Sequence, residues 1–344
     1  MKNLNSIKEF FFGNNAKPII SKKIKINNIP IYDYYSYGNK NSNKIFYVIR
    51  RSPGAGLFSN LTYVLNHLKI ANKHNFIPVV DMENYPTIYN EKNKVNGTKN
   101  AWLYYFKPVS RYTLSEIYQS TNVILTGNSL EQRMYADIAT KNIFETTIKK
   151  YIKFNDKLNK EINYFKKKYF NSNYKILGVH FRGTTYKTAR GHAFPLTKKM
   201  MKKNIDFLLK KFGYNKIFVV TEEVKYLDFL KKNYKDKIIH IDVFRSKALD
   251  AFQYYPRQNH RYKLGKEIVI ETMLLSYCDG LTFIKSNVSS AAVLFSKKKQ
   301  KLHEVFLGYN SRNKYIARWL WFIKRLLPSQ FGGFKIYKYN ELLK

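Results

Sequence analysis

Apolar runs and segments of helical periodicity alternate along most of the chain. Residues 45–49 form an apolar run typical of a buried strand, and residues 58–74 carry apolar side chains at helical spacing. A second apolar run follows at 77–81, and the loop at 50–56 between the first strand and the helix contains glycine. This order predicts the mononucleotide-binding half of a doubly wound sheet, with a helix N-terminus that favours anions.

The second half of the chain repeats the same rhythm. We expect strands at 176–181, 217–221, 238–242 and 281–285, and helices at 196–212, 226–234, 263–278 and 291–295. Because strands and helices alternate in both halves, the sequence predicts an α/β protein with two Rossmann-like, doubly wound domains that face each other across a cleft.

Composition changes between these halves suggest the boundaries. Residues 1–43 are polar and rich in Lys and Asn, so we expect an extension with one short strand at 29–35. We place a first Rossmann-like domain at 44–170, with further helices from 131 to 167, and a second domain at 171–310. A C-terminal helix and tail occupy 311–344.

The formal net charge is +39, which raises the question of nucleic acid. Only 12 of the 62 basic residues are Arg, and Lys is scattered through almost every segment beside Asn and Ile, as in a general compositional bias. No nucleic-acid-binding motif accompanies the charge, so we expect no nucleic-acid partner. A basic surface still favours anionic ligands or an anionic lipid face.

The chain has a single cysteine, Cys278, within an apolar segment, which fits a reducing cytosol. The N-terminal apolar cluster is too short for a signal peptide, and no stretch is long and apolar enough to span a membrane. We therefore expect a cytoplasmic protein.

The C-terminal segment 315–327 has aromatic and aliphatic side chains on one helical face and basic residues beside them. It allows two interpretations: an interfacial helix in peripheral contact with the inner face of the cell membrane, or a helix that crosses back onto the first domain. We favour the crossing helix.

The candidate site begins where the strand at 176–181 ends. His180 and Arg182 alternate with Phe181 and are followed by Gly183 and Thr184. Ligands in α/β folds bind at the carboxyl ends of strands, and the guanidinium fork suits a phosphate. The alternative is an ordinary surface ion pair.

Four stretches together resemble the GT-B superfamily of α-1,6-fucosyltransferases, nodulation fucosyltransferases and protein O-fucosyltransferases. They are a G-x-F-x-N loop at 56–60, an H-x-R motif at 180–182, a strand that ends in T-E-E at 221–223, and an acidic helix followed by a Ser-rich loop, covering 268–271 and 286–290. Their order and spacing agree over roughly residues 45–300.

The resemblance implies an inverting glycosyltransferase that uses a nucleotide-sugar, typically GDP-fucose, without a metal or other cofactor. Carried over, Arg182 would hold the diphosphate and stabilise the leaving group. The implied donor-binding residues are Gly56, Phe58, Asn60, His180, Thr184, Glu271, Ser286, Asn287 and Ser289.

The resemblance leaves the general base open. Thr185 stands where that family often has an acidic residue, and the remaining candidates are Glu223, Glu222 and Asp81, of which we favour Glu223. Glu222 and Glu223 could instead only cap the next helix.

Our leading hypothesis is a transferase that builds capsule or lipopolysaccharide on glycan or lipid-linked acceptors. The alternatives are a non-enzymatic basic protein that binds nucleic acid or anionic polysaccharide, and a different nucleotide-dependent enzyme on the same fold.

Overall fold

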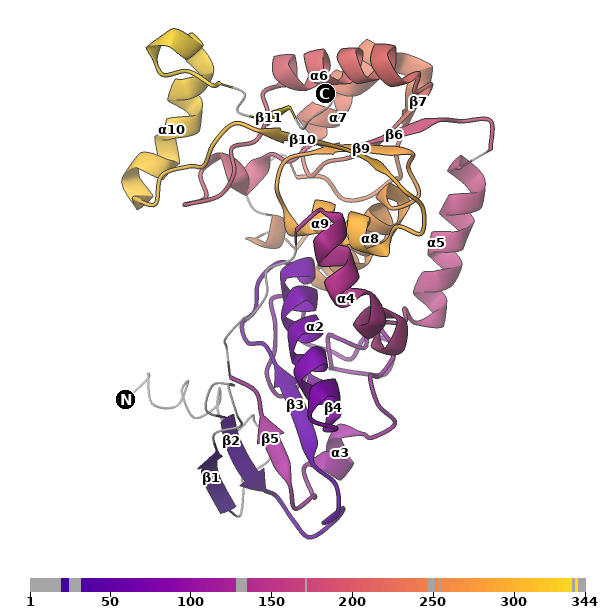
Figure 1. Ribbon diagram of the computed structural model, residues 1–344, viewed down its shortest axis with the longest axis vertical. Helices are drawn as coiled ribbons and strands as arrows, with labels where there is room; N and C mark the ends of the chain where they lie inside the picture. The colour runs from indigo at the N-terminus through magenta and orange to yellow at the C-terminus, as the bar shows by residue number, and fades with distance from the viewer. Residues whose placement is uncertain are drawn as a thin grey trace. The chain divides into compact units, whose positions relative to one another are not determined.

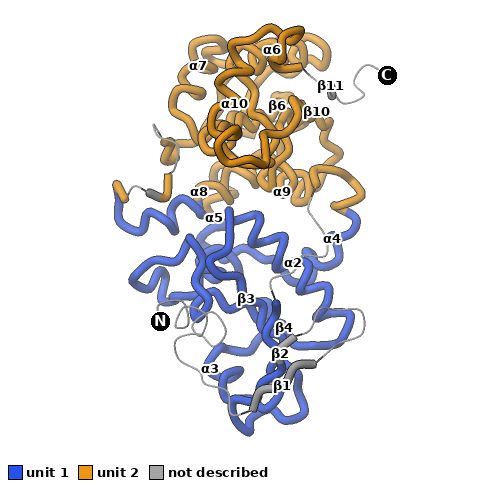
Figure 2. Tube along the Cα trace, turned by 90° about the vertical axis from the view of Figure 1, so that its left-hand side faces the viewer, with its two compact units in different colours: residues 1–134, 142–159, 257–266 blue, residues 135–141, 160–256, 267–344 orange. Residues whose placement is uncertain are grey.

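The computed structural model describes residues 20–24, 32–127, 135–170, 172–246, 251–253, 255–335 and 338–339. The chain divides into two compact units (Figure 2). Unit 1 comprises the described residues within 1–134, 142–159 and 257–266, and unit 2 comprises those within 135–141, 160–256 and 267–344. Each unit is built around its own β-sheet. The sequence-based expectation of two α/β domains is therefore confirmed.

Unit 1 contains a five-stranded sheet in the order β1-β2-β5-β3-β4. Its strands are β1 (Ile20–Ile24), β2 (Tyr32–Ser36), β3 (Phe46–Arg50), β4 (Ile77–Asp81) and β5 (Val123–Leu125). Strand β3 pairs in parallel with β4 and β5, whereas β2 is antiparallel to both β5 and β1. The sheet is therefore mixed rather than wholly parallel.

Helices complete this part of the chain (Figure 1). Helix α2 (Leu57–Lys73) packs on β3 and β4, and it is buried on nearly all sides, since every residue from Asn60 to Leu68 is buried. The short helix α3 (Leu114–Ile117) begins with a capping box between Thr113 and Glu116. Helices α4 (Ile138–Tyr151) and α5 (Asp156–Tyr169) each extend over residues of both units.

Unit 2 has a six-stranded sheet in the order β11-β10-β9-β6-β7-β8. Its strands are β6 (Ile176–His180), β7 (Lys216–Val220), β8 (Ile238–Ile239), β9 (Gly280–Phe283), β10 (Lys301–Phe306) and β11 (Lys338–Tyr339). All pairs from β8 to β10 are parallel. From β6 the chain adds β7 and β8 on one side, and then crosses to add β9 and β10 on the other side. The strand order therefore reverses between β6 and β9, which is the topological switch point of a doubly wound sheet.

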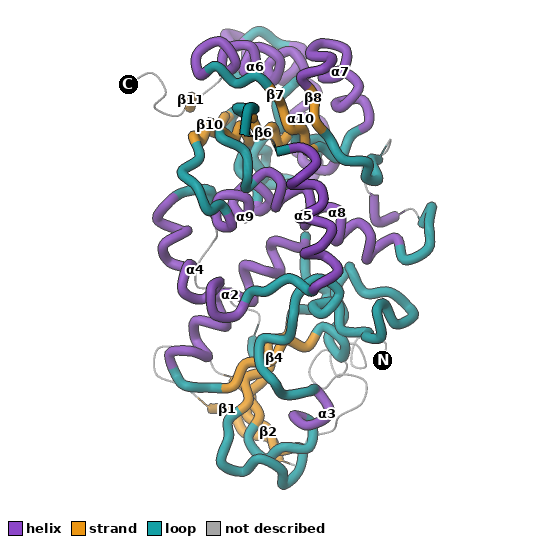
Figure 3. Tube along the Cα trace, turned by 90° about the vertical axis from the view of Figure 1, so that its right-hand side faces the viewer, coloured by secondary structure: helices purple, strands orange, loops and turns teal. Residues whose placement is uncertain are grey.

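The connections in unit 2 are mostly helical (Figure 3). They are α6 (Lys198–Phe212), α7 (Val224–Tyr234), α8 (His260–Leu275), α9 (Asn287–Phe295) and α10 (Lys314–Leu326). Helix α8 extends over both units, because its residues up to Lys266 belong to unit 1. Short 3-10 turns lie at η1 (Thr184–Lys187), η2 (Lys235–Lys237), η3 (Ala251–Gln253) and η4 (Ser329–Phe331). Side chains of β6, β7, α6 and α7 form one buried apolar core.

The structure refines several predicted elements. The strand expected at 29–35 is β2, which begins at Tyr32, and residues 29–31 lie outside the described residues. Strands β1, β10 and β11 were not predicted, and the strand expected at 238–242 ends at Ile239. The start of the helix expected from 131 also lies outside the described residues, and α4 begins at Ile138.

Candidate functional site

Polar side chains gather at the carboxyl edge of the unit 2 sheet. Three parallel strands that are neighbours, β7, β6 and β9, end at Val220, His180 and Phe283. Each strand is followed within a few residues by polar side chains, and these three sets of side chains are far apart in the sequence. Because parallel strands present their carboxyl ends at one edge, the H-x-R, T-E-E and Ser-rich motifs converge there.

Arg182 is held in place by the loop after the neighbouring strand. Its guanidinium forms an ion pair with the carboxylate of Glu222 and lies over the Tyr186 ring, 4.4 Å from the ring centroid. The Arg182 side chain is 17% exposed. A planar cation that is partly accessible and stacked on an aromatic ring is pre-organised to bind an anion with two parallel hydrogen bonds.

Glu223 binds two groups of the η1 turn that follows Arg182. Its Oε1 atom accepts hydrogen bonds from the backbone N–H of Thr184 and from Lys187 Nζ, both at 2.5 Å. Although Glu223 stands at the N-cap of α7, its side chain makes no capping hydrogen bond. The helix-capping alternative for this side chain is therefore wrong, and its contacts lie on the η1 turn.

The backbone of this turn is tight. Thr184 has φ of 39°, in the left-handed region that β-branched residues rarely adopt, and its hydroxyl donates to Glu222. A Cβ atom on Gly183 would lie 2.1 Å from Glu223 Oε1. Strained backbone of this kind persists where surrounding contacts over-determine it, and it clusters at functional sites.

His180 connects β6 to the loop after β9. Its Nδ1 atom lies 3.3 Å from Ser286 Oγ, and the ring is buried. Burial, reinforced by the nearby Arg182 guanidinium, lowers the pKa of His180 to about 3. The imidazole is therefore neutral at physiological pH, and its role at this edge is that of a hydrogen-bonding group rather than a cation.

The buried His180 makes stability depend on pH. Since its folded pKa is about 3 and lies below the unfolded value near 6.5, protons bind the unfolded chain preferentially between those values. Unfolding free energy should therefore fall by up to about 1.4 kcal/mol per pH unit as pH drops below 6.5. Urea unfolding at pH 7 and pH 5 tests this, and a His180→Gln variant should show the smaller loss. An equal loss of unfolding free energy in the wild type and in His180→Gln would contradict the lowered pKa of His180.

The Ser-rich loop caps α9. Ser286 Oγ accepts from the Ser289 backbone N–H, and Ser290 Oγ donates to the Ser286 carbonyl. Ser289 is fully buried, and its hydroxyl bonds within the same loop. Asn287, the first residue of the helix, is exposed. The sequence-predicted hydroxyls therefore shape a helix N-terminus, whose backbone N–H groups are suited to an anion.

Glu271 has a different setting from the one expected. Its buried carboxylate accepts a hydrogen bond from Arg245 at 3.0 Å, and Arg245 also donates to the carbonyls of Ile241 and Val243. Burial raises the pKa of Glu271 to about 8, against the opposing effect of Arg245. In this structure Glu271 therefore anchors the loop after β8.

Three predicted residues lie in unit 1, at the start of α2. The amide of Asn60 bonds both the N–H and the carbonyl of Ala55, at 2.9 and 3.1 Å, so it closes the loop before the helix. Phe58 is buried, and Gly56 is the N-cap residue with open space where a Cβ would stand. Of these three, only Gly56 leaves an accessible backbone approach.

Asp81, an alternative general base, has its carboxylate in hydrogen bonds within unit 1. Its buried carboxylate accepts from the backbone N–H groups of Glu83 and Asn84, from the Asn84 amide and from the Tyr118 hydroxyl. Both carboxylate oxygens of Asp81 therefore bind groups of the protein itself.

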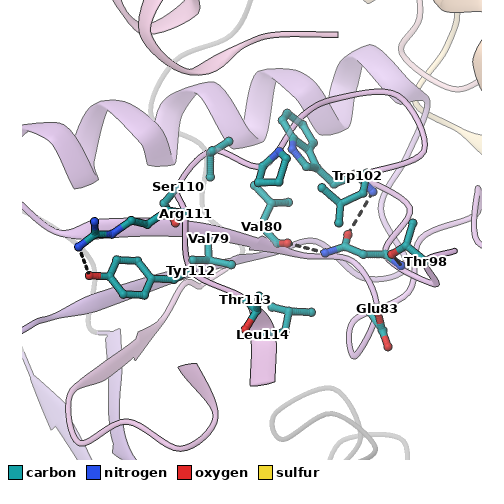
Figure 4. A pocket seen from close by; sticks show the side chains of 14 residues that line it. Val79, Val80, Glu83, Thr98, Trp102, Ser110, Arg111, Tyr112, Thr113 and Leu114 are labelled. Atoms are coloured by element: carbon teal, nitrogen blue, oxygen red, sulfur yellow. Dashed lines mark hydrogen bonds between the residues drawn. The ribbon is translucent and has the colours of Figure 1, made fainter. Parts of the chain in front are cut away.

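Unit 1 also contains a cavity of about 310 Å³ beside β4 (Figure 4). Val79 and Val80 form its floor, and the loops around Trp102 and Tyr112 form its walls. The Asn100 amide braces it by donating to the Val80 carbonyl and accepting from the Trp102 N–H. None of the sequence-predicted site residues lines it.

Sequence reasoning missed three residues of the unit 2 site. Lys187 forms an ion pair with Glu223, and the Tyr186 ring stacks on Arg182. Arg245 forms an ion pair with Glu271. The basic and aromatic residues just after the H-x-R motif were the available signal for the first two. Among the described residues, no three His, Cys, Asp or Glu side chains group as metal ligands.

Comparison with known proteins gives matches only in structure. No protein-family model matches the sequence, and no curated protein matches it. A crystal structure of NodZ α-1,6-fucosyltransferase co-crystallized with GDP matches with a TM-score of 0.51 at 15% identity, over 77% of this chain and 95% of that chain. A selenomethionine structure of fucosyltransferase NodZ from Bradyrhizobium gives 0.50 at 14% identity with the same coverage.

A structure of POFUT1 in complex with GDP-fucose gives a TM-score of 0.40 at 10% identity, over 78% of this chain and 99% of that chain. The resemblance inferred from the four motifs is thus confirmed for the fold: the chain has the GT-B fold of the NodZ fucosyltransferases.

Proposed function

We propose that this protein is a metal-independent, inverting glycosyltransferase of fucosyltransferase type that uses a GDP-linked sugar as donor. The observation that carries this proposal is the convergence of Arg182, the His180–Ser286 pair and the N-terminus of α9 at the switch point of the unit 2 sheet. The NodZ structure with the same fold was crystallised with GDP, which supports a guanine nucleotide as ligand.

The chemistry requires fixed positive groups near the departing diphosphate. As the glycosidic bond to the donor breaks, negative charge grows on the leaving oxygen, and pre-oriented donors lower the barrier. Arg182 supplies the charge and a two-pronged donor, while the α9 N-terminus supplies backbone N–H groups. Neutral His180 holds Ser286 and so helps to fix that N-terminus.

The acceptor hydroxyl must lose a proton as it attacks the sugar. We propose Glu223 for this step, because it is a carboxylate that contacts the η1 turn after Arg182 and is 13% exposed. In this structure Glu223 binds Lys187, so the proton transfer requires that ion pair to open. A Glu223→Gln variant separates this role from a purely positional one. The amide keeps the hydrogen bond from the Thr184 N–H but cannot take a proton.

We extend the proposal to the other donor-binding residues expected from the sequence. Gly56 offers close backbone approach, and Asn60 shapes the loop that carries it. Thr184 follows Arg182 in the η1 turn, and Asn287 is the first residue of α9. Glu271 acts on the nucleotide only if it exchanges its bond to Arg245. We propose a glycan or lipid-linked acceptor in capsule or lipopolysaccharide synthesis at the cytoplasmic face of the membrane.

Thermal unfolding with separate additions of GDP, UDP, CMP and ADP tests the donor assignment. A ligand at about 100 times its dissociation constant stabilises the native state by about 2.7 kcal/mol. We expect a shift with GDP, undiminished by EDTA. A shift with UDP or CMP instead would overturn the GDP assignment.

The same experiment separates the transferase from its alternative. A basic protein that binds polyanions through its net charge of +39 should show no preference among the nucleotides and a steep dependence on salt. No nucleotide shift, together with salt-sensitive binding to an anionic polysaccharide, would replace the transferase proposal.

A further inference from the structure

Helix α10 has two apolar faces. The inner face carries Ala317 and Trp321, both buried, and Trp321 packs into the apolar core of unit 2 while its indole N–H donates to the Pro195 carbonyl at 2.8 Å. This contact anchors the helix on the periphery of unit 2, where Figure 1 shows it in yellow. The inner face therefore accounts for the attachment of the helix to the fold.

The opposite face is apolar as well, but it is exposed. Side chains at 315, 319, 323 and 326 share one stripe, since these positions are three or four residues apart, and the buried positions 317 and 321 fall on the other side of the helix. The exposed apolar side chains are Tyr315, Ile316, Trp319, Ile323 and Leu326, followed by Phe331 in the next turn. Trp319 is 62% exposed and Leu326 is 76% exposed.

Cations border this outer face. Lys314, Arg318 and Arg325 are exposed and occupy the strip between the inner and outer faces. The sequence contains no Asp or Glu between Glu304 and Glu341. A helix that combines an exposed apolar stripe with neighbouring cations and no acidic residue has the composition of a helix that lies in the head-group region of an anionic bilayer.

We propose that the outer face of α10 docks on an anionic lipid surface. Trp319 and Ile323 enter the boundary between head groups and acyl chains, and Arg318 and Arg325 bind lipid phosphates or carboxylates at its edge. The helix has 13 residues, short of the roughly 20 needed to cross, so it lies in the plane of the bilayer. None of the described helices is long and apolar enough to span a membrane.

A second copy of the chain fits this face less well. A two-fold contact through the same stripe would bring the cations that border each helix together, with no acidic partner in the segment to offset them. An anionic lipid surface satisfies the apolar stripe and the cations at once. This inference does not depend on the transferase activity, because it concerns a face that carries none of the proposed donor-binding residues.

Co-sedimentation of the full-length protein with vesicles tests the proposal. Binding should be strong on phosphatidylcholine vesicles that contain phosphatidylserine and weak on phosphatidylcholine alone. A Trp319→Ser, Ile323→Ser double variant should lose about tenfold or more in partitioning. An Arg318→Gln, Arg325→Gln double variant should lose about fivefold per cation on the anionic vesicles.

Matched controls lie on α6, which carries the exposed residues Phe207, Lys199 and Lys203. Phe207→Ser and the Lys199→Gln, Lys203→Gln pair should bind as the wild type does. Tryptophan quenching by brominated acyl chains should also be seen and should vanish in Trp319→Phe, because Trp102 and Trp321 are each 3% exposed.

Three results would overturn the proposal. The first is equal losses in the α6 and α10 charge variants, which would reduce binding to the overall charge. The second is unchanged binding of Trp319→Ser, Ile323→Ser with an unaltered circular dichroism spectrum. The third is a wild-type dimer, seen by sedimentation equilibrium, that this double variant dissociates, which would make the face a protein interface.

Discussion

Replacing Arg182 with alanine is expected to abolish the stabilisation by GDP and to lower kcat by about 100- to 1000-fold, the usual effect of removing one pre-oriented donor from a developing oxyanion. The fold should persist, because the Arg182–Glu222 pair is partly exposed and such pairs contribute little to stability. Calorimetric titration with GDP and an assay of donor turnover measure the two effects.

Two further variants separate charge from geometry at this position. Arg182→Lys keeps the charge but loses the planar fork and the stacking on Tyr186, so it should recover only part of the affinity. Arg312→Ala removes an exposed arginine elsewhere in unit 2 and should leave GDP binding unchanged. If Arg182→Ala binds GDP as tightly as Arg312→Ala does, the phosphate site lies elsewhere.

A methyl group at Gly183 should disable the site by a steric route. The added Cβ would meet Glu223 Oε1 at 2.1 Å and Cδ at 2.7 Å, and the Tyr226 ring at 3.0 Å. Glu223 cannot withdraw without losing its bonds to Thr184 and Lys187. We expect Gly183→Ala to cost about 1–3 kcal/mol of unfolding free energy, as overpacking does, and to remove most activity.

Urea unfolding and turnover assays check the Gly183 prediction against Gly127→Ala, whose new Cβ would meet nothing within 4 Å. Adding Glu223→Ala to Gly183→Ala removes the clashing carboxylate, so stability should partly return while activity stays lost. A Gly183→Ala variant that matches the Gly127→Ala control in both assays would show that the turn after Arg182 tolerates rearrangement.

Local periodicity was sufficient to predict the α/β class and most parallel strands, because buried strands and amphipathic helices leave their pattern in consecutive residues. Strand β10 was missed because the polar residues Lys301, His303 and Glu304 interrupt its apolar pattern, although His303 is buried. Strand β11 was missed because it is only two residues long. The mixed sheet of unit 1 was missed because the antiparallel strand β2 depends on its partner, β5, some 90 residues away.

The candidate site divides in the same way. The sequence by itself determined which residues end the strands, and so placed His180, Arg182, Glu222 and Ser286 at one edge of a parallel sheet. Only the tertiary structure decided which side chains pair. It joins His180 to Ser286 by a hydrogen bond. The ion pairs are Arg182 with Glu222, Lys187 with Glu223, and Arg245 with Glu271. Those pairings join residues up to 106 positions apart. Their choice depends on strand order and on the burial of each charge, neither of which is encoded in any local stretch of the chain.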